Sequence, residues 1–145
     1  MTHHDTGVES PAAATVFNLA DAPTRPMRFD RGTLIALVGE AEGARNVDVH
    51  INVLNVDSGP GPYHFHEHAE NVYIVLEGSL GVVIEGTQHV LERDDVAFIP
   101  PGLRHSAGNA GTVPARVIEI YAPVGSDFHF VDKQPATTSA GPPGA

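Results

Sequence analysis

The middle of the chain consists of short apolar runs separated by turn residues about every eight to twelve positions, as in all-β sandwiches and barrels. The runs predict strands at residues 33–38, 47–54, 63–66, 71–76, 80–85, 89–91, 96–99 and 116–121. Gly78, Gly86 and the stretches 93–95 and 108–111 lie between these runs as turns. We expect no long helix, and at most one helical turn at 41–45. The pattern therefore predicts an all-β chain closed into an antiparallel barrel or two-sheet fold, since closure removes exposed strand edges.

Segment 47–54 shows the strand alternation most clearly. Its valine and isoleucine residues occupy one face, and Asp48, His50 and Asn52 occupy the other. We interpret the polar face as the solvent face, which would place His50 at the surface. The alternative is that His50 faces the barrel interior, where it would be an acid or base in a pocket.

The two ends differ from the middle in composition. Residues 1–14 and 134–145 lack apolar periodicity and cannot bury enough apolar area to offset the entropy of ordering them. We therefore expect a flexible N-terminal segment (1–14), one domain (15–133) and a disordered C-terminal tail (134–145). A chain of 145 residues is long enough for one core and too short for a second domain of ordinary size.

Charge and cysteine content narrow the functional classes. The chain has 18 acidic and 8 basic residues, a net charge of −10. Such a surface repels phosphate backbones and anionic lipids, so we predict neither nucleic acid nor membrane as a partner. The chain contains no cysteine, which excludes disulfides, thiolate metal sites and cysteine nucleophiles. With no apolar run near the roughly 20 residues of a membrane span and no signal-peptide pattern at the start, we expect a cytoplasmic protein.

Three histidines are the strongest chemical signal. His64 and His66 are two residues apart on a predicted strand, so both imidazoles project to the same side. Pro100 and Gly102 predict a turn that can deliver His105 from a neighbouring strand. Neutral imidazoles are good ligands for divalent transition metals. The sequence therefore predicts one metal ion per chain, bound inside a small β-barrel.

At these residues the chain resembles the cupin superfamily. Residues 62–78 contain the His-x-His pair and closing glycine of the first cupin motif, and residues 100–109 match Pro-x-Gly-x-x-His-x-x-x-Asn at every fixed position. Asp94 stands where a glycine usually opens the second motif. The resemblance implies a double-stranded β-helix, or jelly-roll barrel, in which His64, His66 and His105 are metal ligands.

The fourth ligand of that motif, a glutamate, is ambiguous here. Counting back six residues from Gly78 reaches Asn71, whereas Glu70 lies one position earlier. A shift of one residue exchanges the two faces of a strand, so a regular strand points only one of them at the metal. The ungapped register favours Asn71, and a β-bulge after His66 would favour Glu70. Both stay candidate ligands.

Several other residues are candidates for the rim or wall of the pocket. His68 falls in the connection after the His-x-His pair, and we expect it at the rim or in solvent. Phe98, Glu119 and Tyr121 are further candidate walls, although core packing is the simpler interpretation of each. Tyr73, which shares the strand face of Asn71, is a candidate proton-transfer group together with His50.

The resemblance implies three classes of function. The first is a non-haem iron dioxygenase acting on a small chelating substrate such as a diketone or hydroxylated acid, with iron as the expected metal and Tyr73 and His50 in catalysis. The second is a redox-neutral isomerase, lyase or decarboxylase with zinc, manganese or nickel, acting on a small acid, a sugar-like or a polyketide-like compound. The third is a non-enzymatic ligand-binding protein. Small cupins resemble one another in forming homodimers, for which residues 15–38 are the candidate contact.

Overall fold

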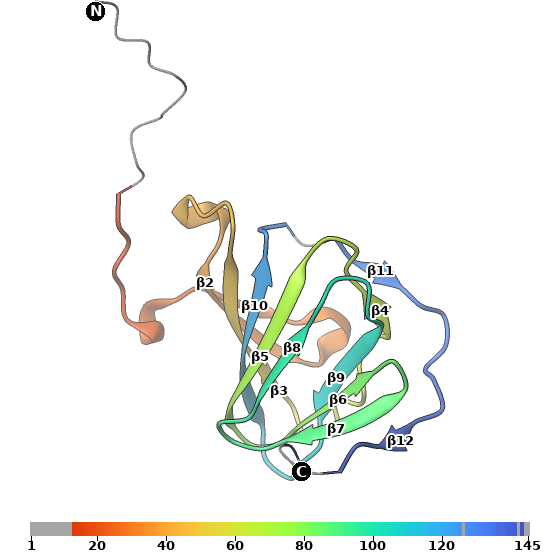
Figure 1. Cartoon of the computed structure of the whole chain (residues 1–145). Helices are drawn as coiled ribbons and strands as arrows, with labels where there is room; N and C mark the ends of the chain where they lie inside the picture. The colour runs from red at the N-terminus through yellow and green to blue at the C-terminus, as the bar shows by residue number, and fades with distance from the viewer. Residues whose placement is uncertain (1–12, 126, 142, 144–145) are drawn as a thin grey trace, which may run out of the picture.

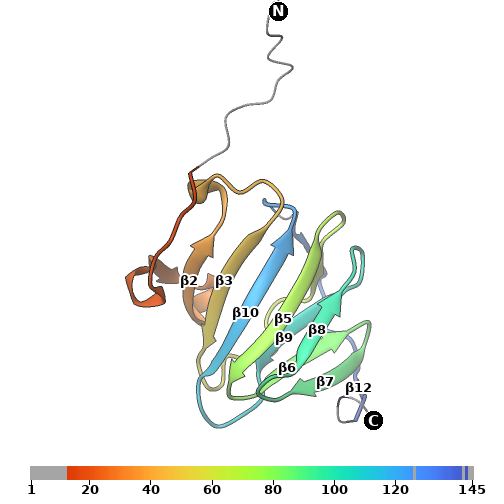
Figure 2. The same ribbon diagram turned by 60° about the vertical axis from the view of Figure 1, so that its left-hand side comes forward.

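The computed structural model describes residues 13–125, 127–141 and 143, and they form two six-stranded sheets that face each other (Figures 1 and 2). The first sheet has the order β1-β2-β3-β10-β5-β8 and the second β11-β4-β9-β6-β7-β12. The strands are β1 (Thr24–Pro26), β2 (Gly32–Val38), β3 (Asp48–Leu54), β4 (His64–Phe65), β5 (Glu70–Glu77), β6 (Leu80–Ile84), β7 (Thr87–Leu91), β8 (Val96–Ile99), β9 (His105–Asn109), β10 (Ala115–Ala122), β11 (His129–Phe130) and β12 (Thr138–Ser139). Three 3₁₀ turns complete the elements: η1 (Leu19–Asp21), η2 (Arg28–Asp30) and η3 (Glu40–Glu42). The prediction of an all-β, two-sheet fold is confirmed.

Strand β9 extends further than the sequence predicts. The sequence predicts His105 on a strand and a turn at Gly108 and Asn109, whereas both residues belong to β9, whose residues are small or polar. Gly108 is required there by close packing: a Cβ atom at this position would lie 1.7 Å from the carbonyl oxygen of Gly59. The turn therefore begins only after Asn109.

The structure bears differently on the predictions for the two chain ends. Residues 1–12 of the predicted flexible segment lie outside the described residues. At the other end, Thr138 and Ser139 form β12, which pairs in parallel with Thr87 and Gln88 of β7. The prediction of a disordered tail over 134–145 is therefore wrong at these two residues, because backbone hydrogen bonds to a sheet edge replace the apolar contacts that the tail lacks.

The interior changes from apolar to polar along the inward rows of the first sheet. On β10, Ala115 and Val117 belong to the hydrophobic core, whereas the next inward residue, Glu119, is a buried carboxylate. On β3, which pairs with β10 in antiparallel register, the sequence Leu54, Asn52, His50 follows the same order. One end of the barrel is thus filled by core side chains, and the other end presents polar groups to a cavity.

Among the described residues, no helix is long and apolar enough to cross a membrane.

Candidate metal centre

The three predicted histidines lie together inside the barrel. His64, on β4, pairs in register with His105, the first residue of β9, and their ring centroids are 4.3 Å apart. His66 follows β4, with its ring centroid 4.9 Å from that of His64 and 5.3 Å from that of His105. All three side chains are buried. The His-x-His spacing and the turn before His105 therefore place three imidazoles around one point.

Backbone carbonyls fix the tautomer of each ring. The Nδ1 atom of His64 lies 2.9 Å from the carbonyl oxygen of Pro62, that of His105 lies 2.9 Å from the oxygen of Leu103, and that of His66 lies 2.6 Å from the oxygen of Asp127. A carbonyl oxygen only accepts hydrogen bonds, so each Nδ1 carries the proton. Each Nε2 atom then carries the lone pair that a metal ligand needs.

The Nε2 atoms have the burial and spacing of a metal site. All three are buried and have no hydrogen-bond partner among the described residues, and the candidate ligand atoms lie within 4.8 Å of one another. Burial, together with the neighbouring His105, lowers the pKa of His64 to about 3, and burial lowers the pKa of His105. Both rings are therefore neutral at pH 7. Buried lone pairs without donors are costly, and a divalent transition metal satisfies all three, so the residues fit the metal that the sequence predicts.

The structure separates Asn71 from Glu70. Asn71 is fully buried on the inward face of β5, whereas Glu70 begins the strand and is exposed. The Asn71 amide nitrogen donates to the Glu119 carboxylate and to the Ile120 carbonyl oxygen, each at 3.1 Å. Its Oδ1 atom is buried and has no partner within the described part of the chain. Asn71 Oδ1 is thus the candidate oxygen ligand, in the ungapped register.

Replacing these two residues should have unequal effects on metal affinity. We expect Asn71→Ala to weaken metal binding by about tenfold, a value typical for loss of a weak or supporting ligand group, and Glu70→Ala to leave it unchanged. Competition with a chromophoric chelator measures both dissociation constants. A larger loss in Glu70→Ala than in Asn71→Ala would show that β5 binds the metal in the shifted register.

Asp127 anchors the segment that carries His66. Its backbone oxygen accepts the His66 Nδ1 hydrogen bond, and its carboxylate accepts from the backbone amides of Glu67 and His68. The His129 imidazole lies 2.9 Å from the same carboxylate. Glu67, Asp127 and His129 also form a second group of closely spaced ligand atoms, but Glu67 is exposed and the Asp127 carboxylate already accepts several hydrogen bonds. His68 is exposed, as expected for a rim residue.

Removing this anchor should loosen the metal site without touching a ligand. We expect Asp127→Ala to lower metal affinity by about tenfold, because partners that orient ligands have effects of that size. Asp132→Ala, which removes an exposed carboxylate nearby, is the matched control and should bind metal like the native chain. Equal affinities for the two variants, measured by chelator competition, would contradict a positioning role for Asp127.

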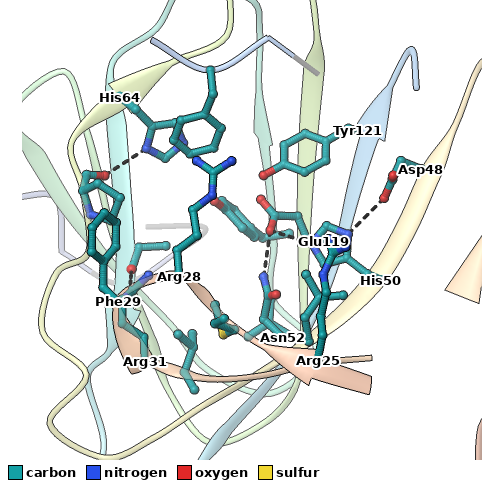
Figure 3. A pocket seen from close by; sticks show the side chains of 18 of the residues that line it. Arg25, Arg28, Phe29, Arg31, Asp48, His50, Asn52, His64, Glu119 and Tyr121 are labelled. Atoms are coloured by element: carbon teal, nitrogen blue, oxygen red, sulfur yellow. Dashed lines mark hydrogen bonds and ion pairs between the residues drawn. The ribbon is translucent and has the colours of Figure 1, made fainter. Parts of the chain in front are cut away.

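A cavity of about 510 Å³ opens beside the histidine cluster and is lined by His64, His50, Glu119, Tyr73 and Tyr121, among others (Figure 3). The interpretation of His50 as a surface residue is wrong, because the polar face of β3 points inward. His50 is buried, with Nε2 3.0 Å from Glu119 and Nδ1 3.1 Å from Asp48. The predicted pocket roles of Glu119 and Tyr121 agree with this lining, whereas Phe98 is exposed and does not line the cavity.

Glu119 is the centre of a buried polar network. Burial alone would raise the pKa of its carboxyl, but hydrogen bonding to His50 and its charge, with further donors from Asn52 and Tyr121, lower that pKa to about 2. Burial would likewise lower the pKa of His50, and the hydrogen bonds and charges of Glu119 and Asp48 reverse this effect, so the pKa is raised. Both ring nitrogens of His50 contact carboxylate oxygens, which accept hydrogen bonds, so the site favours the protonated imidazole next to the buried carboxylate.

Two tyrosines complete the network as neutral acids. Burial and the nearby Glu119 carboxylate raise the pKa of both Tyr73 and Tyr121 well above the usual value, so each hydroxyl keeps its proton. Sequence reasoning named Tyr73 and His50 for proton transfer, and both line the cavity. It did not identify Asn52, whose amide donates to Glu119 at 2.7 Å. The available signal was its position two residues after His50, on the same face of β3.

Comparisons with known proteins agree with this fold. Residues 53–121 match the family model described as "Cupin domain". The chain is 35% identical over 82 residues to the tetracenomycin polyketide synthase protein TcmJ of Streptomyces glaucescens, covering 55% of each protein. It is 37% identical over 79 residues to a germin-like protein of Arabidopsis thaliana, covering 49% of this chain and 36% of that protein. The matches thus span about half or less of these relatives.

Solved structures extend the similarity over most of the fold. The polyketide cyclase RemF of Streptomyces resistomycificus superposes with a TM-score of 0.69 at 22% identity, covering 84% of this chain and 88% of that one. A sugar phosphate isomerase from Silicibacter pomeroyi superposes with a TM-score of 0.65 at 20% identity, covering 86% and 98%. The domain match, the two-sheet jelly roll and the His-x-His and Pro-x-Gly-x-x-His segments together establish that the chain belongs to the cupin superfamily.

Proposed function

We propose that this cupin is a metal-dependent enzyme that catalyses redox-neutral chemistry on a small polycarbonyl compound, by enolisation followed by ring closure. One observation carries the proposal: His64 of the metal-fitting cluster and the buried Glu119–His50 pair line the same cavity. A group that can hold a Lewis acid therefore stands beside a group that can move a proton. Enolisation of a carbonyl compound requires both.

The histidines would hold a divalent transition metal, which would polarise a substrate carbonyl oxygen and make the adjacent CH₂ group more acidic. The Asn71 amide nitrogen donates a hydrogen bond to Glu119, and this bond fixes the orientation of the amide and of its Oδ1 atom. The identity of the metal stays a prediction, with iron, zinc, manganese and nickel all suited to imidazole ligands.

The Glu119–His50–Asp48 series provides a path for one proton. Glu119 Oε2, the carboxylate oxygen that does not contact His50 or Asn52, accepts a proton from the CH₂ group between two carbonyls. His50 passes its Nδ1 proton to Asp48, whose side chain is 36% exposed. One proton enters the series from the substrate and one reaches the surface. The three side chains together lose one negative charge as the substrate gains one, so the total charge of the site does not change.

Ring closure then needs no oxidant. The enolate carbon attacks a second carbonyl carbon of the same molecule, one carbon–carbon bond forms, and the carbonyl π electrons move to oxygen. The oxygen takes back the proton, for which the neutral hydroxyls of Tyr73 and Tyr121 are suitable donors. Loss of water from the ring alcohol completes the reaction with no change in oxidation state.

The relatives support a redox-neutral reaction on carbonyl compounds. TcmJ is named as a polyketide synthase protein, and the structures with the same fold include a polyketide cyclase and a sugar phosphate isomerase. None of these similarities assigns a substrate to this chain. They favour the polyketide-like alternative among the redox-neutral functions predicted from the sequence.

A dioxygenase is the second candidate, and the ligand set favours it. With Glu70 exposed, the candidate ligands are three neutral imidazoles and a neutral amide. Such a site keeps the full charge of its metal ion and suits an anionic chelating substrate. The same diketone could then be cleaved by oxygen instead of being cyclised.

Proton exchange under nitrogen tests the proposal. The protein is loaded separately with Zn²⁺, Mn²⁺ or Fe²⁺ and incubated in D₂O with 3,5,7-trioxooctanoate, in which attack of C2 on the C7 ketone closes a six-membered ring. NMR follows deuterium uptake at the CH₂ groups and the formation of cyclic product. We expect exchange and cyclisation without oxygen, and both lost in Glu119→Gln. Reaction only with iron and oxygen, with oxygen consumed, would overturn the proposal in favour of the dioxygenase. Binding without exchange or oxygen uptake would overturn it in favour of a non-enzymatic ligand-binding protein.

A further inference from the structure

Positive charge is concentrated at the cavity of this acidic protein. Arg25, Arg28 and Arg31 all line the cavity, and they are three of the eight basic residues in a chain of net charge −10. All three come from the short segment around β1 and η2, which covers one side of the barrel. Figure 3 shows Arg28 and Arg25 on different sides of the cavity.

The Arg31 guanidinium has a structural role. It donates hydrogen bonds to the backbone oxygens of Ser58 and Ala107, and so ties the η2 segment to the loop after β3 and to β9. A Cβ atom at Gly61 would lie 2.7 Å from this guanidinium, which shows how closely the surrounding loop packs around it. Two of the five N–H groups of Arg31 are therefore used to hold this segment in place.

Arg28 is differently placed. Its guanidinium carbon lies 5.0 Å from the ring centroid of Phe128 and 5.9 Å from that of Phe130. The Phe128 ring in turn stacks on the imidazole of His64, with centroids 3.9 Å apart. The stacking holds the Arg28 cation next to the metal-fitting cluster, pointing into the cavity (Figure 3). Within the described part of the chain, Arg28 forms no ion pair with a carboxylate.

Two residues of η2 have positive φ angles, which are uncommon for residues other than glycine. Phe29 and Asp30, which directly follow Arg28, have φ angles of 61° and 56°. This left-handed region is unfavourable for residues other than glycine, and for a bulky side chain such as phenylalanine it is a clear outlier. Strained backbone is retained where the fold needs a side chain in a particular place. Here the bend follows directly on Arg28, and both Arg28 and Phe29 line the cavity.

We propose that Arg28 binds a carboxylate on the substrate and thereby determines its orientation in the cavity. This inference rests on the proposed function and specifies its substrate class as anionic polycarbonyl compounds. A guanidinium offers two parallel N–H donors, which match the two oxygens of a carboxylate. With the carboxylate at Arg28 beside Phe128 and His64, the ketone groups of the same chain extend along the cavity toward the histidines and Glu119. An acidic surface elsewhere would repel such a substrate, so the cavity is where a compensating cation is needed.

The test compares 3,5-dioxohexanoate with its neutral methyl ester in the metal-loaded native protein, in Arg28→Gln, in Arg28→Lys and in Arg93→Gln. Arg93→Gln removes the same charge from an exposed turn outside the cavity. We expect Arg28→Gln to lower the acid-to-ester ratio of kcat/KM for CH₂ exchange by about 10- to 100-fold, the value of a charge-assisted hydrogen bond. Arg28→Lys should lower the ratio less, and Arg93→Gln should keep the native ratio.

Binding measured by calorimetry separates this inference from the proposed function. If the native protein binds the acid more tightly than the ester, and Arg28→Gln abolishes the difference, the carboxylate site stands even where no exchange occurs. If exchange occurs with an unchanged acid-to-ester ratio in Arg28→Gln, the function stands and the carboxylate site is overturned. Inorganic phosphate is included as a competitor. Displacement of the acid by phosphate at lower concentration than by acetate would overturn the carboxylate assignment in favour of a phosphate-bearing substrate.

Discussion

We expect His105→Ala to bind at least tenfold less metal per chain than the native protein, because the substitution removes one of three strong ligands. Its Nε2 atom is buried and has no hydrogen-bond partner in the described part of the chain, and its ring lies close to both of the other imidazoles. Each protein is purified without a histidine tag and equilibrated with a chelator at fixed free metal concentration. Elemental analysis then gives the bound metal per chain.

His68→Ala is the control for this experiment, since it removes an exposed imidazole two residues from His66. We expect His68→Ala to retain native stoichiometry. Unchanged stoichiometry in His105→Ala would show that the metal is bound elsewhere. Circular dichroism of both variants establishes whether the barrel is retained, so that a metal loss is not confused with unfolding.

Glu119→Ala should destabilise the fold by about 3–5 kcal/mol, the typical cost of removing one partner from a buried ion pair. The replacement leaves His50, Asn52 and Asn71 with buried donors that have lost their acceptor. Urea unfolding at pH 6 measures the free energy of unfolding. A loss below about 1 kcal/mol, the scale of an exposed ion pair, would contradict the buried network.

The pH dependence of stability gives a second measure of the same pair. The pKa of His50 is raised above 6.5, so its contribution is present below that pH and is lost as the pH rises through the raised value. The pKa of Glu119 is lowered from 4.5 to about 2, so its contribution is present above pH 4.5 and is lost as the pH falls toward 2. Glu119→Gln should flatten both slopes. A native-like pH profile in Glu119→Gln would contradict the assignment.

The sequence was sufficient to predict the barrel and the three histidines because both depend on local signals. Strand alternation, turn residues and the His-x-His spacing act within a few residues, and the eight predicted strands all coincide with observed ones. The ungapped count from Gly78 also favoured the residue that is buried, Asn71, because burial alternates regularly from Asn71 to Val75. The register shift between β5 and β10 lies beyond Val75 and does not exchange the faces of this part.

The facing of β3 could not be predicted in the same way. Its apolar residues Val49, Ile51 and Val53 lie on the outward face, where Ile51 pairs with Ile35 and Ile118, and its polar residues face the cavity. Hydrophobic patterning assumes that the apolar face is the buried one, and a polar cavity reverses that assignment. The contacts of Glu119 with His50 and Asn52, and of Arg28 with Phe128, join residues more than 60 positions apart in the chain, so no local pattern reveals them. The expected homodimer and the identity of the metal stay predictions.

The most direct test of the metal centre is an anomalous-diffraction map of crystals grown from metal-loaded protein, recorded at the absorption edge of the metal. We expect one strong peak per chain, about 2.0–2.2 Å from the Nε2 atoms of His64, His66 and His105. A peak only at the Glu67–Asp127–His129 group, or no peak between the Nε2 atoms of the three histidines, would contradict the account.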